Sequence, residues 1–277
     1  MEQRIKIAEP SKLFEPYIQY YKYIETDMTG TYKIVPISFV ELYFNFTHVN
    51  LFSPDCYDLN FPKIHLAGLQ LYDQNAYSTM FGTDRKGGFC VVFKPRGFYY
   101  LFRIKSSDYC KCCLPGDSVF KNEIYCLWEQ LNGCSDITAM KDLFENSFSG
   151  LARGHSYRPD LLDHILARMD KTIGMIRVSQ LCSIYNITPR TLERHFMEEI
   201  GIPAKEILQI LRINNAIRML AEEPAANLAG LSYLCGYYDQ SHFIRDIKKI
   251  TGMSPLHLQL TETNAKAIDN RLFIKTQ

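Results

Sequence analysis

The stretch Gly236-Tyr237-Tyr238-Asp239-Gln240-Ser241-His242-Phe243-Ile244-Arg245 has the composition of a tight turn followed by a helix. Glycine tolerates the positive φ that such a turn requires, and Asp239 suits the N-cap, where it can accept a hydrogen bond from a free amide of the helix. Phe243 and Ile247 are four residues apart, which places both on one face of that helix. The opposite face, which is polar, is expected to be open.

An earlier segment of the chain repeats this pattern with an offset of 51 residues. The matched pairs are Thr188 with Asp239, Leu192 with Phe243, Arg194 with Arg245, Phe196 with Ile247, and Gly201 with Gly252. Just upstream the offset is 50, and the matched pairs are Leu181 with Leu231, Cys182 with Ser232, and Asn186 with Gly236. Two such units, each a short helix, a turn and a second helix, predict a pair of helix-turn-helix motifs.

The second helix of each unit, here named the reading helix, is predicted to expose polar side chains. In the first unit, Thr188 suits the N-cap and Pro189 suits the first helical position. The open face of the first reading helix is predicted to carry Arg190, Thr191, Glu193 and Arg194. The open face of the second is predicted to carry Gln240, Ser241, His242, Arg245 and, as a phosphate contact, Lys248. Side chains of these types read base edges or bind phosphates, so we expect double-stranded DNA as the partner.

A continuous helix is predicted between the two units, over residues 204–221. This segment has an apolar stripe and no glycine or proline. A helix of about 18 residues is about 27 Å long. Two reading helices held about 34 Å apart could enter successive major-groove segments on one face of DNA.

The stretch around Gly236–Arg245 resembles the DNA-binding domain of the AraC/XylS family of bacterial transcription regulators. The similarity continues through Lys248-Lys249 and Thr251-Gly252-Met253-Ser254-Pro255 and extends over roughly residues 160–260. It implies base contacts from the reading-helix residues named above, except Thr191 and Lys248. It also implies recruitment of RNA polymerase and a role as an activator.

The chain departs from the family pattern at a few positions. Ile247 stands where Phe is usual, and Cys182 stands where Ala is usual. Met197-Glu198-Glu199 occupies positions that are normally basic. The loss of basic charge there predicts weaker phosphate contacts in the first unit.

The first half of the chain has the periodicity of strands. Val40, Leu42, Phe44 and Phe46 alternate with other residues, as in a half-buried strand, and Phe89–Phe93 ends at the turn Lys94-Pro95-Arg96-Gly97. From about residue 120 the apolar spacing becomes helical. The predicted fold class is therefore α+β: a β-rich, cupin-like or small-barrel domain with closing helices, followed by an all-α domain of two helix-turn-helix units.

A small-residue stretch beginning at Ser149-Gly150 has the composition of a linker. We therefore expect a sensor or dimerisation domain at residues 1–150, a DNA-binding domain at 151–260, and a poorly ordered tail at 261–277. The first half loosely resembles small β-rich sensor domains of such regulators. The residues that carry this resemblance are Phe14, Pro16, Tyr17, Tyr21, Val35-Pro36, Gly68, Phe93-Lys94-Pro95-Arg96-Gly97 and Leu101-Phe102. It implies a small-molecule effector, a homodimer, or both.

Charge and composition constrain this interpretation only weakly. The formal net charge is +1; residues 1–150 carry 15 Lys+Arg and 17 Asp+Glu, a net of −2, whereas residues 151–260 carry 13 and 11, a net of +2. The start of the chain does not look like a signal peptide, and no apolar run is long enough to span a membrane. We expect a bacterial cytoplasmic protein without enzymatic activity, cofactor or metal.

Three alternatives stay open. In the first, the N-terminal domain is metal- or redox-active: Cys110, Cys112 and Cys113, with Cys126 and Cys134 downstream, leave room for a sensor. An enzyme such as a DNA-repair methyltransferase would need a zinc-spaced cysteine cluster near the N-terminus, where the first cysteine, Cys56, is isolated. The spacing of Cys110, Cys112 and Cys113 is not that of a zinc knuckle, and His48 and His65 are not closely paired. In the second alternative, the N-terminal half serves only in oligomerisation or in binding another protein. In the third, Arg194 and Arg245 form intramolecular salt bridges instead of DNA contacts.

The aromatic residues of the first half could line an effector pocket or could belong to the core. The residues concerned are Tyr17, Tyr20, Tyr21, Tyr23, Tyr99 and Tyr100.

Overall fold

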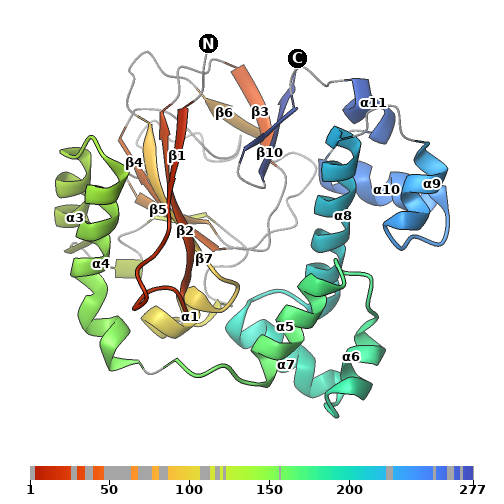
Figure 1. Ribbon diagram of the computed structural model, residues 1–277, viewed down its shortest axis with the longest axis horizontal. Helices are drawn as coiled ribbons and strands as arrows, with labels where there is room; N and C mark the ends of the chain where they lie inside the picture. The colour runs from red at the N-terminus through yellow and green to blue at the C-terminus, as the bar shows by residue number, and fades with distance from the viewer. Residues whose placement is uncertain are drawn as a thin grey trace.

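The computed structural model describes most of the chain. The described ranges are 4–25, 30–34, 40–46, 64–67, 77–80, 87–106, 113–115, 119–120, 123–155, 157–222, 227–251, 254–260, 265–268 and 271–276. The structure has a β-rich part and a helical part, which confirms the α+β class and the two-part organisation (Figure 1).

Two antiparallel sheets form the β-rich part. The larger sheet consists, in spatial order, of β1 (Arg4–Ala8), β2 (Ile18–Glu25), β7 (Gly88–Phe93), β4 (Val40–Asn45), β5 (Ile64–Ala67) and β8 (Cys113–Pro115). The smaller sheet consists of β6 (Tyr77–Met80), β3 (Gly30–Ile34), β10 (Arg271–Thr276) and β9 (Ala265–Ile268).

Strand β4 was expected to be half-buried, and this expectation is wrong. All six of its residues are buried, including Glu41 and Asn45. Glu41 can be buried because Lys22 Nζ, on β2, lies 2.7 Å from its Oε1, and both side chains are almost fully shielded from solvent. Alternating hydrophobicity therefore failed as a guide to exposure at this strand, where a buried ion pair replaces contact with water.

Helices cover the β-rich part at one side and at one end. In Figure 1, α3 (Glu123–Asn132) and α4 (Ile137–Gly154) lie beside the larger sheet and the short α1 (Gly97–Phe102) lies below it. Asp136 caps α4, since its carboxylate accepts hydrogen bonds from the amides of Thr138 and Ala139. The predicted closing helices are thus present.

The predicted linker begins inside helix α4. The helix continues through Ser149-Gly150 to Gly154, because neither glycine interrupts its hydrogen bonding and Ala152 is buried against the core. The segment from His155 to Asp160 then leads to the next helix (Figure 1). The domain boundary at residue 150 remains a prediction, and α4 runs across it.

The helical part contains two groups of short helices and one long helix. Its elements are α5 (Leu161–Lys171), α6 (Val178–Ile184), α7 (Pro189–Glu199), α8 (Ala204–Glu222), α9 (Leu228–Leu234), α10 (Gln240–Thr251) and α11 (Pro255–Leu260). In Figure 1, α8 runs from the group of α5, α6 and α7 to the group of α9, α10 and α11. The predicted connecting helix is confirmed, at 19 residues.

The apolar core is divided between two clusters within α8. One cluster runs from Phe14 in the β-rich part through α4 and α5 to Phe196 and on to Ile210 in α8. The other begins at Ile213 in α8 and includes the buried residues of α9 and α10. The first helix-turn-helix unit therefore shares its core with the N-terminal half, whereas the second unit has a core of its own.

The end of the chain was expected to be poorly ordered, but it forms strands. β10 pairs with β3 and with β9, both antiparallel. The sequence Arg271-Leu272-Phe273-Ile274 is rich in residues that favour strands. The expectation of disorder rested on the polar residues that begin at Thr261 and did not take this later stretch into account. Within the described residues, no helix has the length and apolarity needed to cross a membrane.

Candidate nucleic-acid interface

The turn of the first unit follows the sequence prediction. Helix α6 ends at Ile184, and Asn186 adopts a positive φ of 48°, which an asparagine tolerates better than most residues. Thr188 caps α7 by accepting a hydrogen bond from the amide of Thr191, and Pro189 occupies the first helical position. The predicted start of the reading helix is confirmed.

The first reading helix, α7, turns its apolar residues inward and most of the predicted DNA-binding residues outward. Leu192 and Phe196 are buried, whereas Arg190, Glu193 and Arg194 are exposed. Thr191 is half-buried, and its hydroxyl lies 2.8 Å from that of Thr188. Thr191 thus contributes to the cap as well as lying beside the open face.

The second unit has the same construction. Gly236 adopts a φ of +76° at the turn, where a Cβ would also lie only 3.0 Å from Met175 Cγ. The Asp239 carboxylate accepts a hydrogen bond of 2.7 Å from the His242 amide and so caps α10, the second reading helix. Phe243 and Ile247 are fully buried. The exposed residues of the helix include Gln240, Ser241, His242, Arg245 and Lys248.

Two observations bear on the charges of these faces. Across the described part of the chain, neither Arg194 nor Arg245 forms an ion pair, so both guanidinium groups remain available to a ligand. His242 Nε2 lies 3.7 Å from the nearly buried Asp246 Oδ2, one helical turn away. The carboxylate thus faces the imidazole, and the His242 side chain stays about half exposed to solvent (51%).

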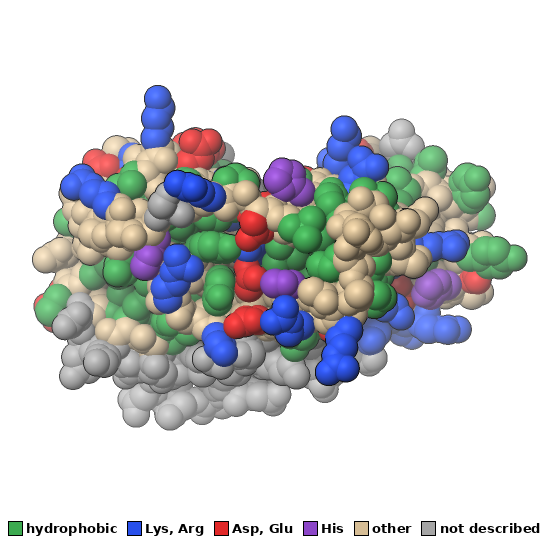
Figure 2. Space-filling model, turned by 90° about the horizontal axis from the view of Figure 1, so that it is seen from below, with side chains coloured by type: hydrophobic (Ala, Val, Ile, Leu, Met, Phe, Trp, Pro, Cys, Tyr) green, Lys and Arg blue, Asp and Glu red, His purple; other side chains and the backbone are tan. Residues whose placement is uncertain are grey.

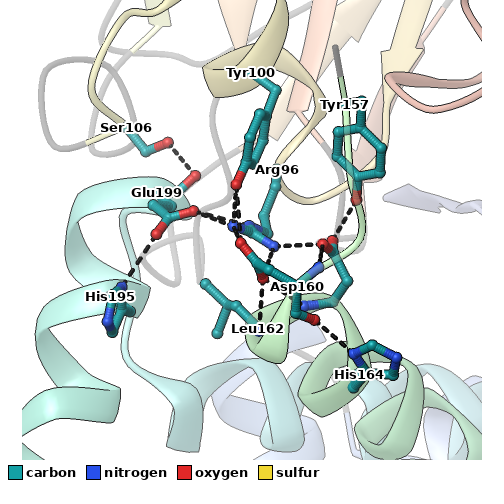
Figure 3. Close-up of polar contacts among 10 residues, drawn as sticks. Arg96, Tyr100, Ser106, Tyr157, Asp160, Leu162, His164, His195 and Glu199 are labelled. Carbon is teal, nitrogen blue, oxygen red and sulfur yellow. Dashed lines mark hydrogen bonds and ion pairs between the residues drawn. The ribbon is translucent and has the colours of Figure 1, made fainter.

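A polar cluster that the sequence prediction missed lies between the two halves of the molecule. Arg96, from the turn after β7, is only 3% exposed and binds carboxylates of α5 and α7 (Figure 3). Its Nη1 lies 2.7 Å from Asp160 Oδ1 and 2.7 Å from Asp163 Oδ2. Its Nη2 lies 2.5 Å from Glu199 Oε2. Its guanidinium also lies 4.7 Å from the centre of the Tyr100 ring.

The cluster perturbs the ionisation of its members. Hydrogen bonds from Arg96 hold the pKa of Asp160 well below its usual range, although partial burial opposes this shift. Despite burial, Asp160 and Glu199 together raise the pKa of Arg96, so its charge is permanent.

Viewed from below, acidic side chains gather along the junction between the left and right parts of the molecule, with Lys and Arg side chains around them (Figure 2).

The cysteine and histidine candidates form no metal site in the described part of the chain. There, no group of three or more His, Cys, Asp and Glu side chains is arranged to hold a metal ion. Cys126 is exposed on α3 and Cys134 is half-buried. Cys113 lies in β8 and His65 in β5, while Cys110, Cys112 and His48 lie outside the described residues.

The tyrosines near the start of the chain belong to the core. Tyr17, Tyr20, Tyr21 and Tyr23 are all buried. The Tyr21 hydroxyl donates a hydrogen bond to Glu145 Oε1, and the Tyr17 hydroxyl donates one to the His155 carbonyl oxygen. These contacts favour the core interpretation over pocket lining, whereas Tyr99 and Tyr100 are half-buried.

Two helix-turn-helix units with open reading helices, joined by one long helix, define a DNA-binding domain. The family model described as a helix-turn-helix domain matches residues 181–260. The predicted resemblance to the DNA-binding domain of AraC/XylS regulators is thereby confirmed over residues 181–260.

No curated protein matches the chain. Among solved structures, the chain is similar to ToxT from Vibrio cholerae, at 13% identity, 94% coverage of this chain, 98% coverage of that chain and a TM-score of 0.47. It is also similar to ToxT from Vibrio cholerae O395, at 16% identity, 93% and 97% coverage and a TM-score of 0.45. A third similar structure is unsaturated fatty acid bound ToxT from Vibrio cholerae strain SCE256, at 14% identity, 94% coverage of this chain, 97% coverage of that chain and a TM-score of 0.43.

Proposed function

We propose that this protein is a sequence-specific DNA-binding regulator of transcription that reads two successive major-groove segments. The observation that supports this proposal is the pair of open reading helices, α7 and α10, at the two ends of α8. Each carries arginine and hydroxyl or amide side chains on its exposed face, types that bind base edges and phosphates.

The base contacts are assigned to exposed residues near the start of each reading helix. In α7 these are Arg190, Glu193 and Arg194, with Thr191 at the edge of the face. In α10 they are Gln240, Ser241, His242 and Arg245, with Lys248 as a phosphate contact. Residues near the N-terminus of a recognition helix are those that contact bases in known helix-turn-helix complexes.

The test is selection of a binding site from random or genomic DNA with the purified full chain, followed by titration at fixed salt. Arg194→Ala and Arg245→Ala should each weaken binding to the selected site by about 1–3 kcal/mol and relax base preference in one half of it. Arg153→Ala is the matched control, because Arg153 is an exposed arginine at the end of α4, outside both helix-turn-helix units. Equal losses in all three variants would show that only total charge matters and would overturn the assignment.

We further propose that the protein is a bacterial cytoplasmic activator that contacts RNA polymerase, and that its N-terminal half binds an effector or dimerises. Family resemblance supports the first part. The second is supported by the size of the β-rich half, which supplies most of the buried residues of the core that it shares with the first helix-turn-helix unit. Transcription assays on the selected site and the measured mass of the protein in solution, with and without cell extract, test these points.

A further inference from the structure

The end of the first reading helix is fastened to the N-terminal half. Arg96 Nη2 binds Glu199 Oε2 at 2.5 Å. The Ser106 hydroxyl donates a hydrogen bond of 2.7 Å to the backbone oxygen of Glu199. Lys105 Nζ lies 3.9 Å from Glu198 Oε1, but this pair is exposed and holds weakly. The buried Arg96 pair is therefore the main ionic connection between α7 and the N-terminal half.

The same guanidinium also holds the start of α5. Asp160 is the N-cap of that helix and Asp163 is its third residue, and each binds Arg96 through a 2.7 Å ion pair. Helices α5 and α7 both pack on α8. One cation from the N-terminal half thus joins two helices of the DNA-binding half at their ends (Figure 3).

The cluster accounts for Glu199, one of the two acidic residues that stand where the family has basic ones after Phe196. A carboxylate at the C-terminal end of a helix is unfavourable beside the helix dipole. Glu199 is the last residue of α7 and lies near two aspartates, so its charge needs a cation. Arg96 supplies that cation, and His195 Nδ1 also lies 3.1 Å from Glu199 Oε1.

The two reading helices differ in their connection to the rest of the molecule. The core that contains Leu192 and Phe196 of α7 is continuous with that of the N-terminal half, while Phe243 and Ile247 of α10 belong to the separate second cluster. A change at Arg96 should therefore reach α7 and not α10.

We propose that Arg96 is a positioning residue for DNA reading: by binding Asp160, Asp163 and Glu199, it sets the orientation of α7 from the N-terminal half. The inference rests on the proposed function of α7. It makes the first half of the binding site, and not the second, dependent on the state of the N-terminal half.

The first test compares Arg96→Met with wild type in DNA titrations of the full chain. Base substitutions are placed in turn in each half of the selected site. Arg96→Met should lower affinity by about tenfold and reduce the penalty for wrong bases in the half read by α7, while the penalty in the other half is retained. Arg103→Met is the matched control, because Arg103 also lies over the Tyr100 ring, at 5.3 Å, but is exposed. It should bind as wild type does.

The second test needs no DNA. Amide hydrogen exchange of α7 should be faster in Arg96→Met and in the nearly isosteric Glu199→Gln, while that of α10 is unchanged. If both halves of the site weaken equally, or if neither base preference nor exchange in α7 changes in the folded variants, the proposal is overturned. A wild-type chain that prefers no DNA sequence would instead overturn the proposed function. The exchange measurement distinguishes the two failures, because it reports the hold of Arg96 on α7 directly.

Discussion

Lys22 and Glu41 form an ion pair across the central strand of the larger sheet. Lys22 lies on β2 opposite Cys90 and Glu41 lies on β4 opposite Val92, so the 2.7 Å contact between Nζ and Oε1 crosses β7. The two side chains are 3% and 1% exposed. Charges removed from water to this extent are stable only while each has its partner.

Replacing one member of this pair should destabilise the fold strongly. We expect Lys22→Met to lower the free energy of unfolding by about 3–5 kcal/mol, because the Glu41 carboxylate would remain buried without its cation. The double variant with Glu41→Leu should recover most of this loss. Urea denaturation of the full chain measures both, and a double variant no more stable than Lys22→Met would contradict the explanation.

Gly97 is at a position where no side chain fits. A Cβ there would lie 1.8 Å from the backbone oxygen of Tyr17. Gly97→Ala should therefore cost about 3 kcal/mol or prevent folding, since the clash involves backbone on both sides. Gly150→Ala is the control, because a Cβ at Gly150 in α4 meets nothing within 4 Å. This control should raise the free energy of unfolding by about 0.5–1 kcal/mol, which thermal unfolding shows as a higher midpoint temperature. A Gly97→Ala variant as stable as wild type would contradict the close approach.

Asp160 should make stability depend on pH in the acidic range. Because Arg96 lowers the pKa of this carboxyl in the folded state, the ionised form stabilises the fold. The contribution is complete above the unfolded pKa of about 3.9 and is lost as pH falls through the lower folded value.

Asp160→Asn tests this dependence. Asparagine is as good an N-cap as aspartate, so the loss comes from the ion pair of Arg96 with this partly exposed carboxylate. The substitution should cost up to about 1 kcal/mol at pH 7, and the difference from wild type should shrink as the pH falls below about 4. Urea denaturation at several pH values measures the difference. A gap between variant and wild type that widens towards low pH would contradict the assigned sign.

Lys248 should contribute to DNA affinity without contributing to sequence preference. It is exposed in the last turn of α10, and we propose that it binds phosphate. Lys248→Ala should weaken binding to specific and non-specific DNA by similar factors and reduce the slope of log affinity against log salt by about 1. Titrations over a range of salt concentrations measure this slope. A variant that loses preference for one base instead would identify Lys248 as a base contact.

The parts of the fold that depend on residues adjacent in the sequence were predictable. The turn at Gly236, the caps at Thr188 and Asp239, and the uninterrupted stripe of α8 each rest on the conformational preferences of a few adjacent residues. The repeat supplied the turn and cap signals twice, once in each unit. For these reasons, the exposed faces of both reading helices could be predicted from the sequence, except that Thr191 is half-buried beside the cap.

The cluster at Arg96 could not be predicted in this way. Arg96 and Glu199 are 103 positions apart, and no periodicity connects a turn after a strand with the end of a distant helix. The available signal was indirect: Glu198 and Glu199 stand where basic residues are usual. That departure was interpreted as weaker phosphate binding, whereas in the structure Glu199 also has an intramolecular partner.

The burial of Glu41 and the strands at the end of the chain were missed for a related reason. Both depend on which strands become neighbours. β10, at the end of the chain, pairs with β3, which lies near its start, and Lys22 reaches Glu41 over a third strand. Sequence patterns describe the faces of a strand but not its neighbours.

The continuity of α8 has a geometric consequence for the DNA sites this protein can use. One residue inserted into a helix advances it by about 1.5 Å and rotates everything beyond it by about 100°. One base pair, by contrast, rotates DNA by about 34°. Lengthening α8 by a single residue would therefore turn α10 away from the groove that α7 faces, and no shift of one or two base pairs would restore the match. Under the proposed function, the length of this one helix would therefore fix the spacing between the two halves of the binding site.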